Sequence, residues 1–257
     1  MKSYSNTIYL TLVFIALAIP AIGLGQVKHS FYAGISTEQI RERNISSSIF
    51  SGIGPHIEYT YSQQGNWNKE IGVQGLLIRP KSKLENKENA LFTNVNLYVN
   101  FVKALDLNRH YFLGISFRTD YQGAYYNNFD QSHFYWASFL GSGIKFKYSR
   151  AVAERFFIKS NFGMPLIGFV SRPETIRETK ADSKSPGYLL SAVHSGLQLS
   201  LPNRYFKPAV QIALAYSSSN KHSAEVFYTY ESLRAKTSYS RELEEMTHSV
   251  GFKYTFQ

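Results

Sequence analysis

The sequence predicts an all-β protein, an antiparallel transmembrane β-barrel of about 10 strands. Three observations support this prediction. Apolar and polar residues alternate along many segments of strand length, so they fall on opposite faces of a strand. The connections between these segments alternate between short turns and long polar loops. The last segment, residues 248–257, places Val250, Phe252, Tyr254 and Phe256 on one face, as a closing barrel strand does.

The composition is compatible with a single barrel. The chain has 257 residues, 44% of them hydrophobic and 16% aromatic, with a net charge of +10 and no cysteine. The 19 Tyr and 19 Phe favour strands. The lack of cysteine excludes disulfides, thiolate catalysis, zinc–thiolate sites and a lipidated cysteine anchor. A mean hydropathy of −0.25 would be low for a helical membrane protein, but in a barrel only alternate residues face lipid.

The N-terminal segment is typical of a secretory signal peptide. Lys2 precedes an apolar run over residues 8–19, which is followed by Pro20 and small residues up to Gly25. We therefore expect residues 1–25 to be a signal peptide that is cleaved after Gly25, and residues 26–257 to form the barrel. The alternative is a retained transmembrane helix, because the apolar stretch is nearly long enough to span a membrane. Pro20 and the strand pattern that begins at Val27 favour cleavage.

The first four expected strands cover residues 27–36, 52–62, 71–77 and 91–101. A polar loop at 41–48 follows the first strand, a short turn at 63–66 the second, and a charged loop at 80–89 the third. The fourth strand has the clearest alternation, which predicts lipid on one side and a polar interior on the other. Its apolar face contains Leu91, Val95, Leu97, Val99 and Phe101, and its polar face contains Asn94, Asn96, Tyr98 and Asn100.

Three further strands are expected at residues 111–121, 134–148 and 155–164. A tight connection at 106–108 and a polar loop at 122–132 flank the first of them. In two of these strands, aromatic residues bracket ten-residue spans, Tyr111 to Tyr121 and Trp136 to Phe146. Ten residues at about 3.3 Å each, tilted by about 40°, rise about 25 Å, which is the height of an apolar band between two aromatic girdles.

The last part of the pattern is less regular. After a long loop at 171–187 we expect strands at 188–199 and 206–216, joined by a short turn at residues 202–204. Residues 217–246 form the longest expected loop before the closing strand. Within it, residues 225–232 and 234–241 could make a further hairpin, which would give 12 strands. The second arm has little apolar face, so we expect both arms to lie above the membrane.

Through these strands, the signal peptide and the aromatic end of the last strand, the mature chain resembles the small Gram-negative outer-membrane β-barrel proteins. The resemblance implies an outer-membrane location, with long extracellular loops, short periplasmic turns and both termini in the periplasm. It also implies contact with outer-membrane lipid, lipopolysaccharide and the barrel-insertion machinery. Gln257 after Phe256 departs slightly from the commonest ending. The class includes pores, assembly factors, adhesins and a few enzymes, and no subfamily is indicated.

The catalytic patterns of barrel enzymes are not found in the sequence. Barrel lipases and deacylases place His and Ser two residues apart on one strand face, whereas His29, His194, His222 and His248 each directly precede a serine. The aspartates are isolated, and none precedes a histidine at the spacing that barrel proteases use. No nucleotide-binding fingerprint is present. We therefore predict no catalytic, cofactor-binding or metal-binding residues, and a protein that is not an enzyme.

Charged residues on the inward faces are the candidate functional group. Acidic neighbours are fewer than the basic residues and are chiefly Glu58 and Glu70, so the lumen could favour small anionic solutes. The alternative is a network of ion pairs that plugs the barrel, since ten strands enclose a radius of only about 10 Å. The candidate lumen-lining residues are Lys28, His56, Glu58, Arg118, Lys145, Lys147, Lys159, His194, Lys207 and Lys253.

The expected function is therefore either a structural or binding barrel, or a narrow and anion-favouring pore. A lipid-modifying outer-membrane hydrolase is the alternative, with loop-borne histidines such as His133 or His222 at its centre. A soluble periplasmic β-protein is a third interpretation. The positive charge does not predict nucleic-acid binding in an exported protein.

Overall fold

The computed structural model describes residues 26–44, 48–82, 90–126, 133–172, 196–219, 221–238 and 240–257. The expected signal peptide, residues 1–25, lies outside the described residues, as do parts of the expected loops at 41–48, 80–89 and 122–132 and nearly all of the loop at 171–187. Among the described residues there is no helix that is long and apolar enough to cross a membrane.

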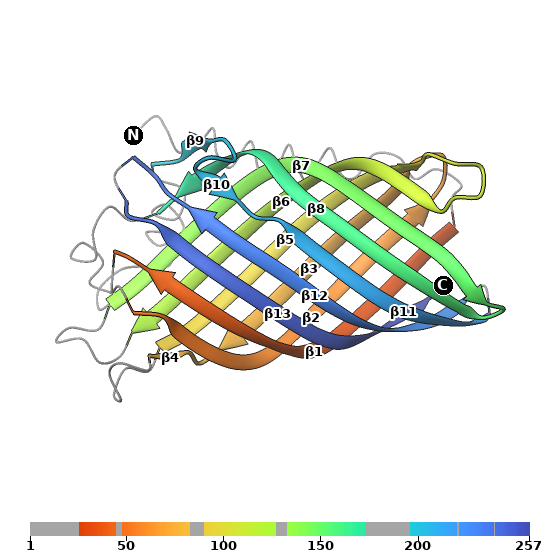
Figure 1. Cartoon of the computed structure of the whole chain (residues 1–257), viewed down its shortest axis with the longest axis horizontal. Coiled ribbons are helices and arrows are strands. Elements are labelled where there is room, and N and C mark those ends of the chain that lie inside the picture. The colour runs from red at the N-terminus through yellow and green to blue at the C-terminus, as the bar shows by residue number, and fades with distance from the viewer. Residues whose placement is uncertain are drawn as a thin grey trace.

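Ten long antiparallel strands form a closed barrel, as predicted (Figure 1). Closure results from β1, which pairs with β2 on one side and with β13 on the other. Three short strands, β4 (Lys81–Ser82), β9 (Gln198–Ser200) and β10 (Tyr205–Phe206), are added at one end. The long strands are β1 (Gln26–Glu42), β2 (Phe50–Gln64), β3 (Asn68–Ile78), β5 (Ala90–Ala104), β6 (Tyr111–Tyr126), β7 (His133–Ala153), β8 (Phe156–Ser171), β11 (Ala209–Ser219), β12 (His222–Ala235) and β13 (Leu243–Phe256).

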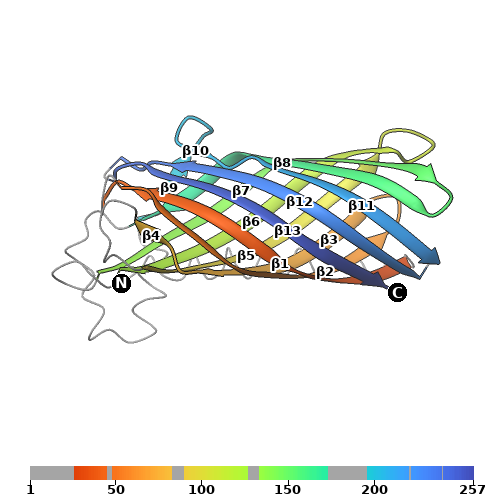
Figure 2. The same ribbon diagram turned by 60° about the horizontal axis from the view of Figure 1, so that its bottom comes forward.

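The two ends of the barrel differ in their connections (Figure 2). One end, which we call the turn end, has short links after β2, β5, β7 and β11. In the link after β5, the carboxylate of Asp106 accepts hydrogen bonds from the backbone N–H groups of Tyr111 (2.9 Å) and His110 (3.1 Å). These bonds hold the pKa of Asp106 below its usual value, and the bond from Tyr111 has the largest effect. The other end, the loop end, has the longer links and contains β4, β9 and β10.

One expected barrel strand is absent from the wall. A strand is expected at 188–199, of which residues 188–195 lie outside the described residues. In the described part, β8 pairs directly with β11, and residues 198–200 form the short strand β9 beside β8. The expected turn at residues 202–204 lies between β9 and β10 at the loop end. There the N–H of Arg204 donates to the carbonyl of Leu201 at 2.8 Å. Residues 198–206 therefore extend the wall beyond the loop-side end of β11. There β9 pairs with β8 and β10 pairs with β12.

A strand that we did not expect replaces it. The whole of β12 falls within the long loop expected at 217–246, yet β12 pairs along its length with β11 and β13. In the hairpin considered from the sequence, residues 225–232 pair with the polar residues 234–241. Their actual partner is β13, which begins at Leu243 and is longer than the expected closing strand. The count of ten strands was therefore right, while one of the ten was placed in the wrong segment.

The outer surface of the barrel is an apolar band. Ile57 is 64% exposed, Ile35 is 59% exposed and Val250 is 56% exposed. Aromatic rings gather at the turn end of this band, where His29 and Phe256 stack with ring centroids 5.5 Å apart. Such exposure of large apolar side chains is typical of a surface that faces lipid. One girdle residue differs from expectation, because Trp136 is buried.

The alternation reverses at the loop ends of β1, β2, β3, β12 and β13, which we call the rim. There large apolar side chains such as Ile40, Phe50 and Ile78 point inward and are buried, together with a few acids. The outward side chains include charged ones, and Arg41 and Glu244 form an ion pair at 3.0 Å. The wall thus has two zones, an apolar band with a polar inside and a rim with an apolar inside.

Candidate functional site

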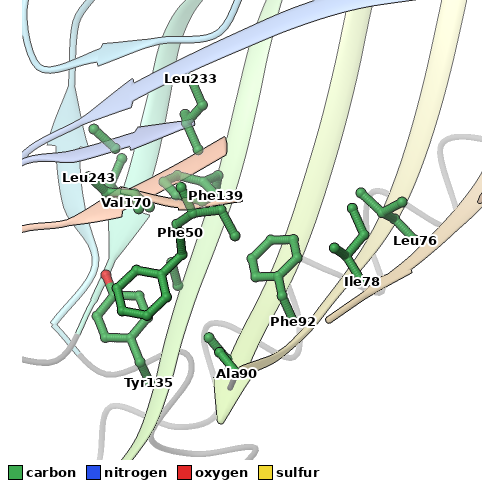
Figure 3. Packing of buried hydrophobic residues seen from close by; sticks show 14 of the residues in the cluster. Phe50, Leu76, Ile78, Ala90, Phe92, Tyr135, Phe139, Val170, Leu233 and Leu243 are labelled. Carbon is green, nitrogen blue, oxygen red and sulfur yellow. The ribbon is translucent and has the colours of Figure 1, made fainter. Parts of the chain in front are cut away.

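An apolar cluster, which we call the plug, fills the loop-side part of the lumen (Figure 3). Every member is at most 9% exposed. Within it the rings of Phe139 and Tyr205 stack with their centroids 5.3 Å apart. Tyr205 lies so close to Gly168 that a Cβ there would be 3.0 Å from its ring, so glycine permits this packing. The plug consists of Ile40, Phe50, Leu76, Ile78, Ala90, Phe92, Ala124, Tyr135, Ala137, Phe139, Val170, Tyr205, Leu233, Ala235 and Leu243.

A buried arginine ties the plug to the loop end. Arg172, directly after β8, donates two hydrogen bonds to the carboxylate of Glu42, at 2.7 and 2.8 Å. It also donates to the carbonyls of Ala235 (2.8 Å) and Arg241 (2.7 Å) and to the hydroxyl of Tyr135. The side chains of Arg172 and Glu42 are 0% and 1% exposed. All three guanidinium nitrogens therefore have partners, and the ends of β1, β8 and β12 are held together.

A charged layer lies on the turn side of the plug. Lys207 contacts Asp120 at 2.9 Å and Glu231 at 3.1 Å. Arg118 binds the same two acids, with distances of 2.6 Å to Glu231 and 3.0 Å to Asp120. Asn96 donates to Asp120 at 2.5 Å. These contacts join β5, β6 and β12 to the segment before β11, so the barrel is cross-linked through its interior.

Between this layer and the turn end lies a cavity of about 160 Å³, which we call the lumen cavity. Its basic side chains outnumber its acidic ones. The charged residues that line it are Arg118, Lys145, Lys147, Lys207, Lys253, Glu58, Glu70 and Glu231. Neutral hydrogen-bonding residues include His56, Thr60, Gln74, Asn96, Tyr98, Asn100, Ser116, Asn161, Gln211 and Thr229.

The acidic groups of the lumen cavity already have partners. Glu58 accepts hydrogen bonds from Tyr98 (2.5 Å) and Thr60 (2.8 Å). Glu70 forms an ion pair with Lys147 and accepts a hydrogen bond from Asn100 at 3.1 Å. Glu231 is bound by Arg118 and Lys207. None of these carboxylates lies within ion-pair distance of Lys145 or Lys253, and within the described part of the chain neither lysine forms an ion pair.

The structure places the candidate lumen-lining residues at different depths. His56, Glu58, Arg118, Lys145, Lys147, Lys207 and Lys253 surround the lumen cavity. Lys159 lies nearer the turn end and forms an ion pair with Glu225. Lys28 is half-buried at the start of β1, and His194 lies outside the described residues.

Glu58 and Glu70 are not the chief inward acids, as the sequence suggested, because further acids face the lumen. Glu225 and Glu231 are inward-facing on β12, the strand that we assigned to a loop, and each pairs with a lumen cation. Glu38 and Glu245 are also buried, near the loop-side ends of β1 and β13. Glu225 and Glu231 could have been predicted as inward-facing residues if β12 had been recognised as a barrel strand.

The candidates for a hydrolase are not assembled into a catalytic site in the described residues. His222 lies on β12 at the turn end, not on a long loop, and its Nδ1 lies 2.9 Å from the hydroxyl of Tyr254. The side chain of His133 lies outside the described residues. A His–Ser contact does exist across strands, at 3.1 Å between His56 and Ser36. Ser36 is fully buried and also contacts Ser249 at 2.6 Å, so a substrate could not reach its hydroxyl.

No cluster of His, Asp and Glu among residues in the described ranges could hold a metal ion.

No family model matches this chain, and the search of curated proteins found no match. Among solved structures the chain is similar to the outer membrane protease OmpT from Escherichia coli, with 10% identity, 93% of this chain and 100% of that chain covered, and a TM-score of 0.50. It is also similar to the translocator domain of the autotransporter NalP from Neisseria meningitidis, with 8% identity, coverage of 98% and 95%, and a TM-score of 0.46. A third is Ail, the attachment invasion locus protein of Yersinia pestis, with 11% identity, coverage of 90% and 99%, and a TM-score of 0.38.

At these identities the likeness concerns the fold alone. It confirms the resemblance to small outer-membrane β-barrels that the sequence pattern predicts, and it indicates no subfamily.

Proposed function

We propose that this chain is an outer-membrane β-barrel whose lumen is closed, a structural or binding barrel that does not act as an open pore. The plug is the observation on which this proposal depends. Its side chains come from strands all around the wall and are at most 9% exposed. A close-packed apolar cluster leaves no room for hydrated ions, and moving an ion through it without water is very costly.

The outer surface supports a membrane location. The apolar band has large exposed side chains such as Ile53 and Ile57, which are stable on a barrel only against lipid or a detergent. Above it the rim has outward charges, including Arg43 and Glu244 at 3.4 Å. We place this rim at the level of the lipopolysaccharide headgroups, with the turn end in the periplasm and the loop end outside.

The ion pairs of the lumen support closure further. Lys207 and Asp120 are 1% and 0% exposed, so solvent does not reach these two side chains. Arg118 and Lys207 share Glu231 and thereby link opposite parts of the wall. Charges that are paired in this way cross-link the lumen, and these paired cations are not available to bind a permeating anion. No contact among the described residues favours the hydrolase alternative.

The test is conductance of the purified, folded protein in a planar bilayer. We expect no steady current from the natural protein, and transient openings from a Phe139→Gly/Tyr205→Gly variant that removes the ring stack. Ile212→Ala, on the lipid-facing side of β11, is the matched control and should remain silent. Steady current from the natural protein would refute the closed barrel. Heat-modifiable mobility in the outer-membrane fraction tests the location, and recovery as a soluble protein would refute it.

A further inference from the structure

We propose that the lumen cavity is a one-ended binding site for a small oxyanion such as phosphate or sulfate, held between Lys145 and Lys253. The inference rests on the proposed closed barrel, because closure at the loop end makes the turn end the only entrance. It assigns a ligand class to a barrel that would otherwise have only a structural role.

The charge distribution is the first support. Lys145 on β7 and Lys253 on β13 both line the cavity, and neither has an ion-pair partner among the residues that the structure describes. Glu58 faces the same space, but its hydrogen bonds with Tyr98 and Thr60 orient it away from ion-pair distance. One acid facing two free ammonium groups leaves an excess of positive charge. A bound anion would neutralise this excess.

The neutral lining supplies matching donors. The hydroxyls of Ser116 and Thr229 line the cavity, and Thr229 already accepts a hydrogen bond from Gln211 at 3.2 Å. The proton of the Thr229 hydroxyl is therefore free to donate to a ligand oxygen. Ammonium groups together with hydroxyl donors are a typical environment for an oxyanion.

The dimensions limit the ligand. The cavity measures about 160 Å³, and a water molecule occupies about 30 Å³ in the liquid. A phosphate or sulfate with a few waters can be accommodated, whereas a lipid headgroup attached to its acyl chains cannot. The ligand source is therefore the free ion.

Access comes from the turn end. The ion pair of Lys147 and Glu70, on that side, has side chains 19% and 22% exposed. The next pair toward the turn end, Lys159 with Glu225, has a lysine that is 32% exposed. The pair of Lys207 and Asp120, on the plug side, is shielded from solvent. Solvent therefore enters from the turn end and stops at the charged layer.

The experiment is isothermal titration of the folded, full-length mature barrel in detergent with inorganic phosphate, and separately with sulfate. We expect saturable binding that weakens with added salt, and at least about tenfold weaker binding in Lys145→Gln and in Lys253→Gln. Lys103→Gln removes one exposed charge from the outer face of β5 and should bind as the natural protein does. Heat-modifiable mobility of each variant establishes that the barrel is folded.

The outcomes separate this inference from the closed barrel. Absence of saturable phosphate and sulfate binding, or equal affinity in folded Lys145→Gln and Lys253→Gln variants, overturns the oxyanion site. It leaves the closed barrel intact if conductance is absent. Steady conductance overturns the closed barrel and the one-ended entrance together, whatever the titration gives.

Discussion

The rim and the apolar band are built from the same strands, yet they reverse the arrangement of apolar and polar side chains. On β1, Ile35 points outward in the band and is 59% exposed, whereas Ile40 points inward in the rim and is 2% exposed. The band places apolar side chains outward against lipid and polar side chains in the lumen. The rim behaves as a water-soluble barrel does, with a packed core inside and charges outside. The solvent outside each zone therefore decides which face is apolar, while the backbone continues unchanged.

The largest expected effect breaks the core of the loop end. Arg172→Met leaves Glu42 buried without its partner, and we expect the free energy of unfolding to fall by about 3–5 kcal/mol. Arg172→Met/Glu42→Leu should recover most of this loss, because no buried charge remains. Urea unfolding of the refolded protein in detergent measures both. Equal losses in the single and double variants would mean that packing, not the ion pair, determines the effect.

A second pair of variants compares the two zones on one face of one strand. Ile35→Arg puts a charge into the band and should cost about 2–4 kcal/mol. Gln39→Arg puts the same charge at the outward face of the rim, where water solvates it, and should change stability by about 0.5 kcal/mol or less. Unfolding from lipid vesicles provides the comparison. Similar losses at both positions would contradict the proposed boundary between lipid and water.

A smaller effect distinguishes a packed interior from a lipid contact. Ile78→Val removes one methylene from the plug, and we expect a loss of about 0.5–1.5 kcal/mol because the surrounding side chains cannot fill the space. Ile57→Val removes the same group from the lipid-facing surface, where an acyl chain can move into the gap. The loss at position 57 should therefore be the smaller one. A larger loss at Ile57 in the same vesicle assay would argue that the plug is loosely packed.

The smallest effect is expected for the outward charges of the rim. Glu244→Gln removes an acid that contacts Arg41 at 3.0 Å and Arg43 at 3.4 Å, with the side chains of all three partly exposed. Because water and salt screen such pairs, the change should stay below about 1 kcal/mol and decrease further at high ionic strength. A loss above about 2 kcal/mol, or one that salt does not reduce, would show that these charges do more than keep the rim hydrated.

Sequence patterns predicted the band well because its alternation is local. Neighbouring residues of a strand point to opposite faces, so the polarity of Asn94 and Val95 indicates which face each one occupies, whatever the neighbouring strands are. The same pattern fails at the rim. There Ile40 and Arg41 also alternate, but apolar residues face the interior, and alternation alone does not tell which side is inside.

What the sequence by itself determined is the closed antiparallel barrel, its count of ten strands and the alternation of short and long connections. What only the tertiary structure decided is which segments are neighbours. Pairing of β1 with β13, and of Arg172 with Glu42, joins residues far apart in the chain. Strand register is set by the closure of the whole barrel and not by any local stretch of residues. For this reason the plug and the lumen cavity could be identified only in the folded protein.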